Sequence, residues 1–247
     1  MNKKLRHQLN PSLSADCVIF GFDGNDLKVL LIERSLEFQE KMLSTLPGDL
    51  IYEHEDLEVA AHRILNELTG IQNIFLEQLG AFGNIDRLDK ESDKKWLHSI
   101  RTEPEKRVVT VAFYSLVNIH AYSPQPSSFA KAAKWVSVKE VEELGFDHLK
   151  IFQSALNKLK LILKIQPIGF NLLPEKFTLT ELNKLYEAIL CKPLDKRNFR
   201  RKMLKLKIIE PLQEKQQGVA HKPSRYFQFN ETTYNQLVND GFDNYGF

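Results

Sequence analysis

Runs of apolar residues separated by turn-forming residues predict a β-sheet in the first part of the chain. Residues 16–22 and 27–33 are two such runs, and the sequence Asp-Gly-Asn-Asp between them favours the turn of a β-hairpin. Other segments rich in valine, phenylalanine and further strand-forming residues predict three more strands, over residues 76–82, 108–117 and 135–138.

Apolar positions spaced three and four residues apart predict helices in the same region. The expected helices cover residues 56–69, 139–144 and 148–163, and Gly70 suits a left-handed cap after the first of them. A strongly charged segment, residues 88–106, interrupts the pattern between two of the strands. We expect it to form an exposed loop or a short surface helix.

A second domain is predicted after residues 165–174, a segment with two prolines and one glycine that suits a packed boundary. Thr178 and Glu181 have the spacing of a capping box and precede an amphipathic pattern. Asp195 is then placed to cap a second helix, residues 196–205. The sequence therefore predicts domains over residues 1–164 and 165–247.

The helix over residues 196–205 has the two faces that a DNA-reading helix needs. One face is apolar and anchors the helix, and its residues are Phe199, Met203 and Leu206. A hairpin expected over 208–212 and 224–229 would place residues 216–223 at the tip of a wing. Basic and amide side chains suit phosphates and base edges. The candidate DNA-binding residues are Lys196, Arg197, Asn198, Arg200, Arg201, Lys205, Lys222 and Arg225.

The charge distribution supports this interpretation of the second domain. Residues 1–164 carry 21 basic and 23 acidic side chains, whereas residues 165–247 carry 13 and 9. The segment 176–207 is the most basic, with 10 basic and 3 acidic side chains. Such a segment attracts phosphate backbones by counterion release. A lysine-rich, solvated helix face would give the same count.

The composition is typical of a globular protein, with 43% hydrophobic and 27% charged residues. Cys17 and Cys191 lie far apart and have no histidine or cysteine neighbours at ligand spacing, so neither a disulfide framework nor a zinc site is expected. The basic N-terminus is not followed by an apolar h-region, and no apolar run approaches the length of a membrane span. We therefore expect a cytoplasmic protein that does not bind membranes.

Residues 47–71 carry the most informative motif. Their spacing matches G-x5-E-x7-R-E-U-x-E-E-x-G-U, the signature of the Nudix family, in which U is a bulky aliphatic residue. The matching residues are Glu55, Arg63, Glu67 and Gly70. The chain thus resembles the Nudix family, and this resemblance implies an α/β fold, an α/β/α sandwich around a mixed sheet. We interpret Arg63 and Glu67 as an ion pair that holds the loop onto the helix.

The same motif lacks carboxylates that hydrolysis needs. Nudix hydrolases place several glutamates on one face of this helix to bind Mg²⁺, which prefers hard oxygen ligands. Two of those positions are Ile64 and Leu68, and Asp49 replaces the leading glycine. Glu53, Glu55 or Glu58 would have to supply the missing ligands. We therefore expect no enzymatic activity, no metal site and no other cofactor.

A Nudix fold without its catalytic carboxylates can keep the pocket for binding. Residues 80–87 and 107–114 read G-A-F-G-N-I-D-R and R-V-V-T-V-A-F-Y, which resembles the sensor domain of Nudix-related transcriptional regulators. Arginines suit a phosphate and aspartates suit sugar hydroxyls. The candidate effector-binding residues are Arg34, Asp49, Asp86, Arg87 and Arg107. Ion pairs that brace a loop or a dimer contact are the alternative role for each.

The segments 166–174 and 195–200 also resemble these regulators. The resemblance implies a Nudix domain followed by a small α+β winged helix-turn-helix domain, in a homodimer that binds a palindromic operator. Regulators of this group respond to a sugar such as arabinose, in the Bacteroidetes branch, or to ADP-ribose, in the NAD-metabolism branch. Residues 46–51 are more similar to the sugar branch, which favours control of carbohydrate-utilisation genes.

Two other functions remain open at this stage. A degenerate Nudix hydrolase would act on ADP-ribose-like diphosphates and use the basic domain to bind its substrate or RNA. A general nucleic-acid-binding protein would keep the Nudix fold for structural reasons alone. Release of phosphate or AMP from ADP-ribose would indicate the hydrolase, and a sharp preference for one palindrome would exclude general binding.

Overall fold

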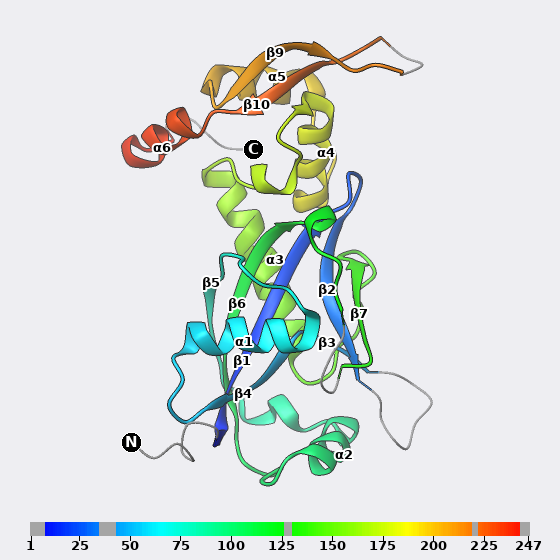
Figure 1. Cartoon of the computed structure of the whole chain (residues 1–247), viewed down its shortest axis with the longest axis vertical. Helices are drawn as coiled ribbons and strands as arrows, with labels where there is room; N and C mark the ends of the chain where they lie inside the picture. The colour runs from blue at the N-terminus through cyan, green and yellow to red at the C-terminus, as the bar shows by residue number, and fades with distance from the viewer. Residues whose placement is uncertain (1–7, 35–42, 126–129, 219–221, 243–247) are drawn as a thin grey trace. The chain divides into compact units, whose positions relative to one another are not determined.

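The computed structural model describes residues 8–34, 43–125, 130–218 and 222–242 of the chain (Figure 1). Its internal contacts divide the chain into two compact units. The first contains Met1–Gly21 and Lys28–Ala155, and the second contains Phe22–Leu27 and Leu156–Phe247. This division falls inside a helix, ahead of the domain boundary at residues 164/165 expected from the sequence.

One sheet forms the centre of the first unit. Among the described residues it has seven strands in the order β3-β2-β1-β6-β5, with β4 paired to β1 and β7 paired to β2. The β1–β4, β2–β3, β2–β7 and β5–β6 pairs are antiparallel. The strands are β1 (Leu9–Phe22), β2 (Leu27–Arg34), β3 (Leu43–Thr45), β4 (Gly48–Tyr52), β5 (Glu77–Phe82), β6 (Val109–Asn118) and β7 (Ala132–Ser137).

Helices α1 (Leu57–Thr69) and α3 (His148–Ile165) contact opposite faces of this sheet. Successive residues of a strand point to opposite sides. Ile19 of β1 packs with Ile64 of α1 in the main apolar core, whereas the neighbouring Phe20 contacts Phe152 of α3, with ring centroids 6.2 Å apart. The expected α/β fold with helices on both faces is therefore confirmed.

Local sequence signals account for the ends of α1. The helix begins after Asp56, and Gly70 follows its last residue with a φ of 73°, the left-handed conformation predicted for it. The Gly70 N–H donates to the carbonyl of Asn66 at 2.8 Å. The apolar stripe between these ends, which includes Ile64 and Leu68, is fully buried in the core.

The helix predicted over residues 139–144 is wrong. Val138 and Lys139 form a turn, Glu140 lies in a bend, and residues 141–144 have no regular structure. Its backbone serves the charged segment instead: Lys90 donates to the carbonyl of Leu144 at 3.0 Å, and the N–H of Phe146 donates to Asp93 at 2.8 Å. These long-range hydrogen bonds replace the ladder of a helix.

The charged segment 88–106 is less exposed than predicted. It forms helix α2 (Glu91–Ile100), as one of the two expectations had it, but three of its side chains are buried. Trp96 and Leu97 pack with Phe146 in a small apolar cluster, and Asp93 is fully buried beside them. The insertion is thus part of the first unit's packing.

The second unit contains a winged helix. Its helices α4 (Leu179–Leu190) and α5 (Lys196–Leu206) pack with a sheet of order β8-β10-β9, and helix α6 (Glu231–Asp240) follows. The strands are β8 (Phe177–Thr178), β9 (Ile209–Lys215) and β10 (Arg225–Phe229). The hairpin of β9 and β10 confirms the predicted strands.

Both predicted helix caps in this unit are confirmed. Thr178 and Glu181 form a complete capping box at the start of α4. The Asp195 side chain accepts a hydrogen bond from the N–H of Asn198 at 2.7 Å at the start of α5. Tyr186 of α4 and Phe199 of α5 meet edge to face, with ring centroids 5.2 Å apart, which fixes the two helices against each other.

Candidate effector pocket and DNA-binding surface

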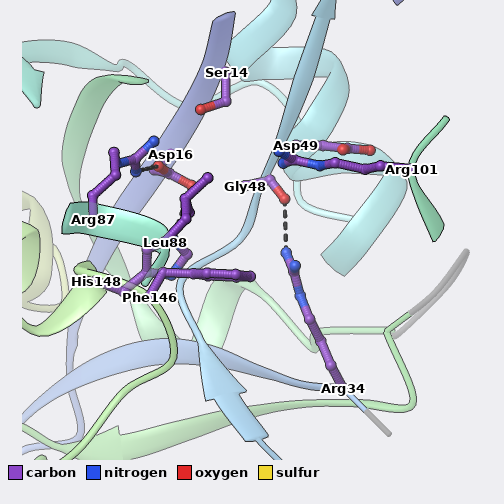
Figure 2. A pocket seen from close by; sticks show the side chains of 10 residues that line it. All are labelled: Ser14, Asp16, Arg34, Gly48, Asp49, Arg87, Leu88, Arg101, Phe146 and His148. Atoms are coloured by element: carbon purple, nitrogen blue, oxygen red, sulfur yellow. Dashed lines mark hydrogen bonds and ion pairs between the residues drawn. The ribbon is translucent and has the colours of Figure 1, made fainter. Parts of the chain in front are cut away.

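A small polar pocket lies beside strand β4, where the Nudix motif begins (Figure 2). Its volume of about 20 Å³ is room for about one water molecule. Most of the side chains around it are charged or polar. The lining residues are Ser14, Asp16, Arg34, Gly48, Asp49, Arg87, Leu88, Arg101, Phe146 and His148.

Arg34, a predicted effector-binding residue, is buried at the end of β2. Its Nη2 donates to the carbonyl of Gly48 at 2.8 Å, as the dashed line in Figure 2 shows. The guanidinium lies over the ring of Trp96, 4.3 Å from its centroid, and 5.7 Å from that of Phe146. Burial lowers the pKa of Arg34 to about 10, so the side chain stays charged at neutral pH.

Arg87, a second predicted effector-binding residue, is held by two aspartates. Its Nη2 lies 2.9 Å from Oδ1 of Asp147 and 3.5 Å from Oδ2 of Asp16, and its Nε donates to Asp147 at 3.2 Å. All three side chains are nearly inaccessible to solvent. This geometry is that of a buried structural ion pair, the alternative role considered for the residue from the sequence.

Asp16 also faces His148 in this network. The N–H of Leu46 donates to Nδ1 of His148 at 3.0 Å, which leaves the ring hydrogen on Nε2, 3.3 Å from Asp16 Oδ1. Burial alone would raise the pKa of Asp16, but His148 and Arg87 outweigh burial and hold this pKa well below its usual value. Asp16 is therefore an ionised carboxylate inside the pocket.

Asp49 and Arg101 complete the charged lining. The two side chains lie next to each other in Figure 2, and Asp49 Oδ1 accepts a hydrogen bond from the N–H of Leu50 at 2.7 Å. Burial raises the pKa of Asp49 and lowers that of Arg101, because both charged forms lose contact with water. The pocket thus combines three arginines with two aspartates.

The structure places Asp86 and Arg107 outside this pocket. Asp86 is exposed in a short 3₁₀ helix, and Arg107 is exposed and donates to the carbonyl of Gly83 at 2.9 Å. Arg107 lines a second cavity of about 230 Å³, which shares Arg87 and Leu88 with the pocket. The predicted effector-binding residues therefore divide into a group of three at the pocket and two that lie apart.

Within the Nudix motif, the predicted ion pair is present. Arg63 lies 3.0 Å from Glu67 on the same helix and makes two hydrogen bonds of 2.7 Å to Glu55 in the preceding loop. A further hydrogen bond, 3.2 Å long, joins Arg63 to the carbonyl of Leu50. The arginine and both glutamates thus hold the loop against helix α1. Gly70, the last matching residue of the motif, ends this helix.

The two positions that lack glutamates point into the protein core. Ile64 and Leu68 are 0% and 1% exposed and pack with residues of β1, β2 and β6. Among the residues that the structure describes, no group of three or more His, Cys, Asp and Glu side chains is arranged to hold a metal ion. An apolar core therefore occupies the face of α1 on which Ile64 and Leu68 lie.

The predicted DNA-binding residues of the second unit are all exposed. Phe199 and Met203 bury one face of α5, whereas Leu206 is only half buried. The opposite face is exposed, and Arg201 donates there to the side chain of Asn198 at 3.1 Å. Its basic and amide residues are Arg197, Asn198, Arg201 and Lys205, whereas the exposed Lys196 and Arg200 flank the buried face.

The hairpin adds Lys222 and Arg225, both exposed, to the candidate DNA-binding residues. Arg225 is the first residue of β10 and pairs with Lys215 of β9. Residues 219–221 of the predicted wing tip lie outside the described residues. A basic helix and a basic hairpin on one winged helix give the charge pattern that phosphate backbones attract.

Comparison with known proteins identifies the family. The model of the NUDIX domain matches residues 10–155, and that of the NrtR DNA-binding winged helix domain matches residues 169–229. The "ADPR responsive transcriptional repressor NtrR" of Acinetobacter baylyi is 32% identical over 225 residues, which cover 89% of this chain and 82% of the relative. The chain is a Nudix-related transcriptional regulator of the NrtR family.

Solved structures agree with this assignment. The chain is similar to Shewanella oneidensis NrtR in complex with a 27mer DNA, with 27% identity, a TM-score of 0.68, and coverage of 90% of this chain and 95% of the other. A MutT/nudix family protein of Enterococcus faecalis has the same fold, with 24% identity and a TM-score of 0.65 over 89% and 86% of the two chains. None of the described helices of this NrtR-family regulator is long and apolar enough to cross a membrane.

Several pocket residues of this NrtR-family chain escaped the sequence analysis. Asp16 lies on β1, Arg101 follows α2, and His148 begins α3, so only the folded chain brings them together. Trp96, which lies under Arg34, is part of the insertion that had been expected to be exposed. A buried position for Asp16 could have been suspected, because Asp16 directly adjoins the apolar run of a predicted strand.

Proposed function

We propose that this regulator senses ADP-ribose in the pocket of its Nudix domain and that the bound nucleotide changes its affinity for an operator. The observation that carries the proposal is the cluster of charged side chains at the start of the Nudix motif, where Arg34, Arg101 and Asp49 lie beside the ion pair of Arg87. The Acinetobacter baylyi relative, which is 32% identical to this chain, is an ADP-ribose-responsive repressor. The proposal extends that response to this chain.

The chemistry of the pocket suits this ligand. Guanidinium groups bind phosphate oxygens with strong, often paired hydrogen bonds, and ADP-ribose carries a diphosphate. Carboxylates accept hydrogen bonds from ribose hydroxyls, and Asp16 and Asp49 supply them. A ligand of this size enters only if the side chains around the present space of about 20 Å³ move apart.

We also propose that the domain binds its effector without hydrolysing it. Ile64 and Leu68 support this view, since both lie in the apolar core at positions where Nudix hydrolases carry glutamates. Glu55 is engaged by Arg63, and Glu53 and Glu58 are exposed. A Mg²⁺ site would need several free carboxylates at one place.

Operator recognition is expected to involve a homodimer. Two copies of α5 would meet half-sites about one helical turn apart, which gives a palindromic operator. An effector that prefers one arrangement of the two winged helices changes operator affinity by linkage. The exposed basic residues of α5 and the hairpin would make the DNA contacts.

Fluorescence anisotropy tests the proposal. Labelled palindromic duplexes from the region upstream of the gene are titrated with the full chain, with and without ADP-ribose. We expect a preference for one duplex over random DNA and at least a tenfold change of its Kd with ADP-ribose, about 1.4 kcal/mol of coupling. Equal binding to every duplex at physiological salt would contradict the operator, and an unchanged Kd would contradict the effector.

Two further samples separate the remaining alternatives. A pentose such as arabinose replaces ADP-ribose in one, because the loop at residues 46–51 favoured a sugar effector and control of carbohydrate genes. A response to the pentose alone would replace ADP-ribose as the effector. In the other, ADP-ribose is incubated with the protein and Mg²⁺, and release of AMP at an enzymatic rate would indicate a hydrolase instead.

A further inference from the structure

The insertion 88–106 is anchored over the effector pocket by its own helix. Trp96 and Leu97 of α2 pack with Leu88 and Phe146, and Phe146 also lines the pocket. The buried carboxylate of Asp93 accepts the N–H of Phe146 at 2.8 Å. Apolar packing and a buried hydrogen bond fix the helix, so the residue that follows it has a defined position.

That residue is Arg101, the C-terminal cap of α2. Its backbone N–H donates to the carbonyl of Leu97 at 2.8 Å, and its side chain extends into the pocket toward Gly48 and Asp49 (Figure 2). The Nε and Nη1 atoms of the side chain are buried, and among the described residues neither has a hydrogen-bond partner. Burying donors of a charged group without acceptors costs free energy that a bound acceptor would recover.

Each of the other two pocket arginines has a defined hydrogen bond or ion pair, although Nε of Arg34 is buried as well. Arg87 is paired with Asp147 and Asp16, and Arg34 donates to the carbonyl of Gly48 and lies on Trp96. Arg101 and Arg34 repel each other electrostatically, since both are cations in a space with little water. An anion bound by Arg101 would satisfy its donors and reduce this repulsion.

We propose that Arg101, supplied by the insertion, binds a phosphate group of the effector and so makes the pocket selective for phosphorylated ligands. This inference rests on the proposed function, because it assigns a residue to the same effector site. It also gives the insertion a role: α2 positions the guanidinium, and Trp96 supports the neighbouring Arg34.

Isothermal titration calorimetry of the full chain tests the proposal with ADP-ribose and with inorganic pyrophosphate. Arg101→Gln removes the charge, and Arg101→Lys keeps it without the planar group of donors. Lys95→Gln is the control, because Lys95 is exposed on the same helix, pairs with Glu91 and lines neither cavity. Operator binding without ligand and the midpoint of thermal unfolding verify that each variant is folded.

We expect Arg101→Gln to weaken ADP-ribose binding about 10- to 100-fold, as loss of hydrogen bonds between charged groups does, with a smaller loss in Arg101→Lys and none in Lys95→Gln. Pyrophosphate binding should fall in parallel. Unchanged ADP-ribose affinity in a folded Arg101→Gln would overturn the role of Arg101 and leave the proposed function intact.

Failure of the proposed function gives a different result. If the wild-type chain binds pyrophosphate through Arg101 but not ADP-ribose, Arg101 keeps its role as a phosphate-binding residue and the effector is another phosphorylated compound. If the wild-type chain binds neither ligand, both the effector and the role of Arg101 are overturned.

Discussion

The effector pocket and helix α5 are both rich in arginine, but they use the charge in opposite ways. In the pocket, Arg34, Arg87 and Arg101 lie among buried groups, and each contact has a defined geometry. On α5 the candidate DNA-binding side chains are exposed to solvent. The energy of a buried charge depends on its individual partners. Exposed charges attract a ligand together, and salt screens that attraction.

This contrast distinguishes the two functions that we propose for the pocket and for the helix. The pocket can discriminate among small ligands, since a mispaired buried charge is costly. The helix can hold any phosphate backbone and needs base contacts for specificity. Substitutions in the two regions should therefore affect different measurements.

The largest expected effect is in the pocket. Arg87→Met leaves Asp147 and Asp16 without their buried cation, and we expect the free energy of unfolding to fall by about 3–5 kcal/mol. Urea unfolding followed by circular dichroism measures this change. Arg107→Met is the matched control, because the exposed Arg107 should change stability by about 0.5 kcal/mol or less. Equal losses in the two variants would show that the Arg87 pair is not structurally important.

The next effect is on DNA binding. Arg201 and Lys205 lie on the exposed face of α5. If they contact bases, Arg201→Ala and Lys205→Ala should each weaken operator binding by about 1–3 kcal/mol. If they contact the DNA backbone, each substitution should reduce the slope of log affinity against log salt concentration by about one, the value for one phosphate contact. Anisotropy titrations at several salt concentrations distinguish the two cases. Unfolding stability should not change, and unchanged DNA affinity in both variants would exclude α5 as the reading helix.

A smaller effect concerns acid stability. The pKa of Asp16 is lower in the folded chain than in the unfolded chain, so this carboxylate stabilises the fold above about pH 4 and loses that contribution as the pH falls further. Asp49 and Asp93 have raised pKa values and act in the opposite direction. Asp16→Asn should therefore lower stability at pH 7 and make stability less dependent on pH below 4. Urea midpoints at pH 3, 4 and 7 measure this, and parallel curves for both proteins would contradict it.

The smallest effect is expected for an exposed ion pair. Lys176 lies 2.7 Å from Glu214 in the second unit, and both side chains are more than half exposed. Lys176→Ala should lower the free energy of unfolding by about 1 kcal/mol or less, because water and salt screen such a pair. A loss as large as that of Arg87→Met would contradict the distinction between buried and exposed charges.

Much of the fold could be predicted because local signals agree with it. Gly70, Asp195 and the Thr178 capping box each end or begin a helix as their residue types predict. The helix expected over 139–144 does not form, and the carbonyl of Leu144 at its end accepts a hydrogen bond from Lys90 of the insertion, far away in sequence. Tertiary contacts of this kind leave no periodic pattern in the sequence.

The site could be predicted only in part. Arg34, Asp49 and Arg87 lie at the pocket, whereas Asp86 and Arg107 are exposed outside it. Asp16, Arg101 and His148 come from three separate elements, and only packing of α2 and α3 around the sheet brings them together. The homodimer and the sugar effector stay predictions.

The central claim, that the Nudix domain binds its effector instead of hydrolysing it, is tested most directly by one titration. ADP-ribose is titrated into the full chain in a calorimeter with Mg²⁺ present, and the ligand is then recovered and separated by chromatography. We predict saturable binding and recovery of intact ADP-ribose. Turnover of the ligand to AMP, or the absence of binding heat at millimolar ligand, would contradict the account.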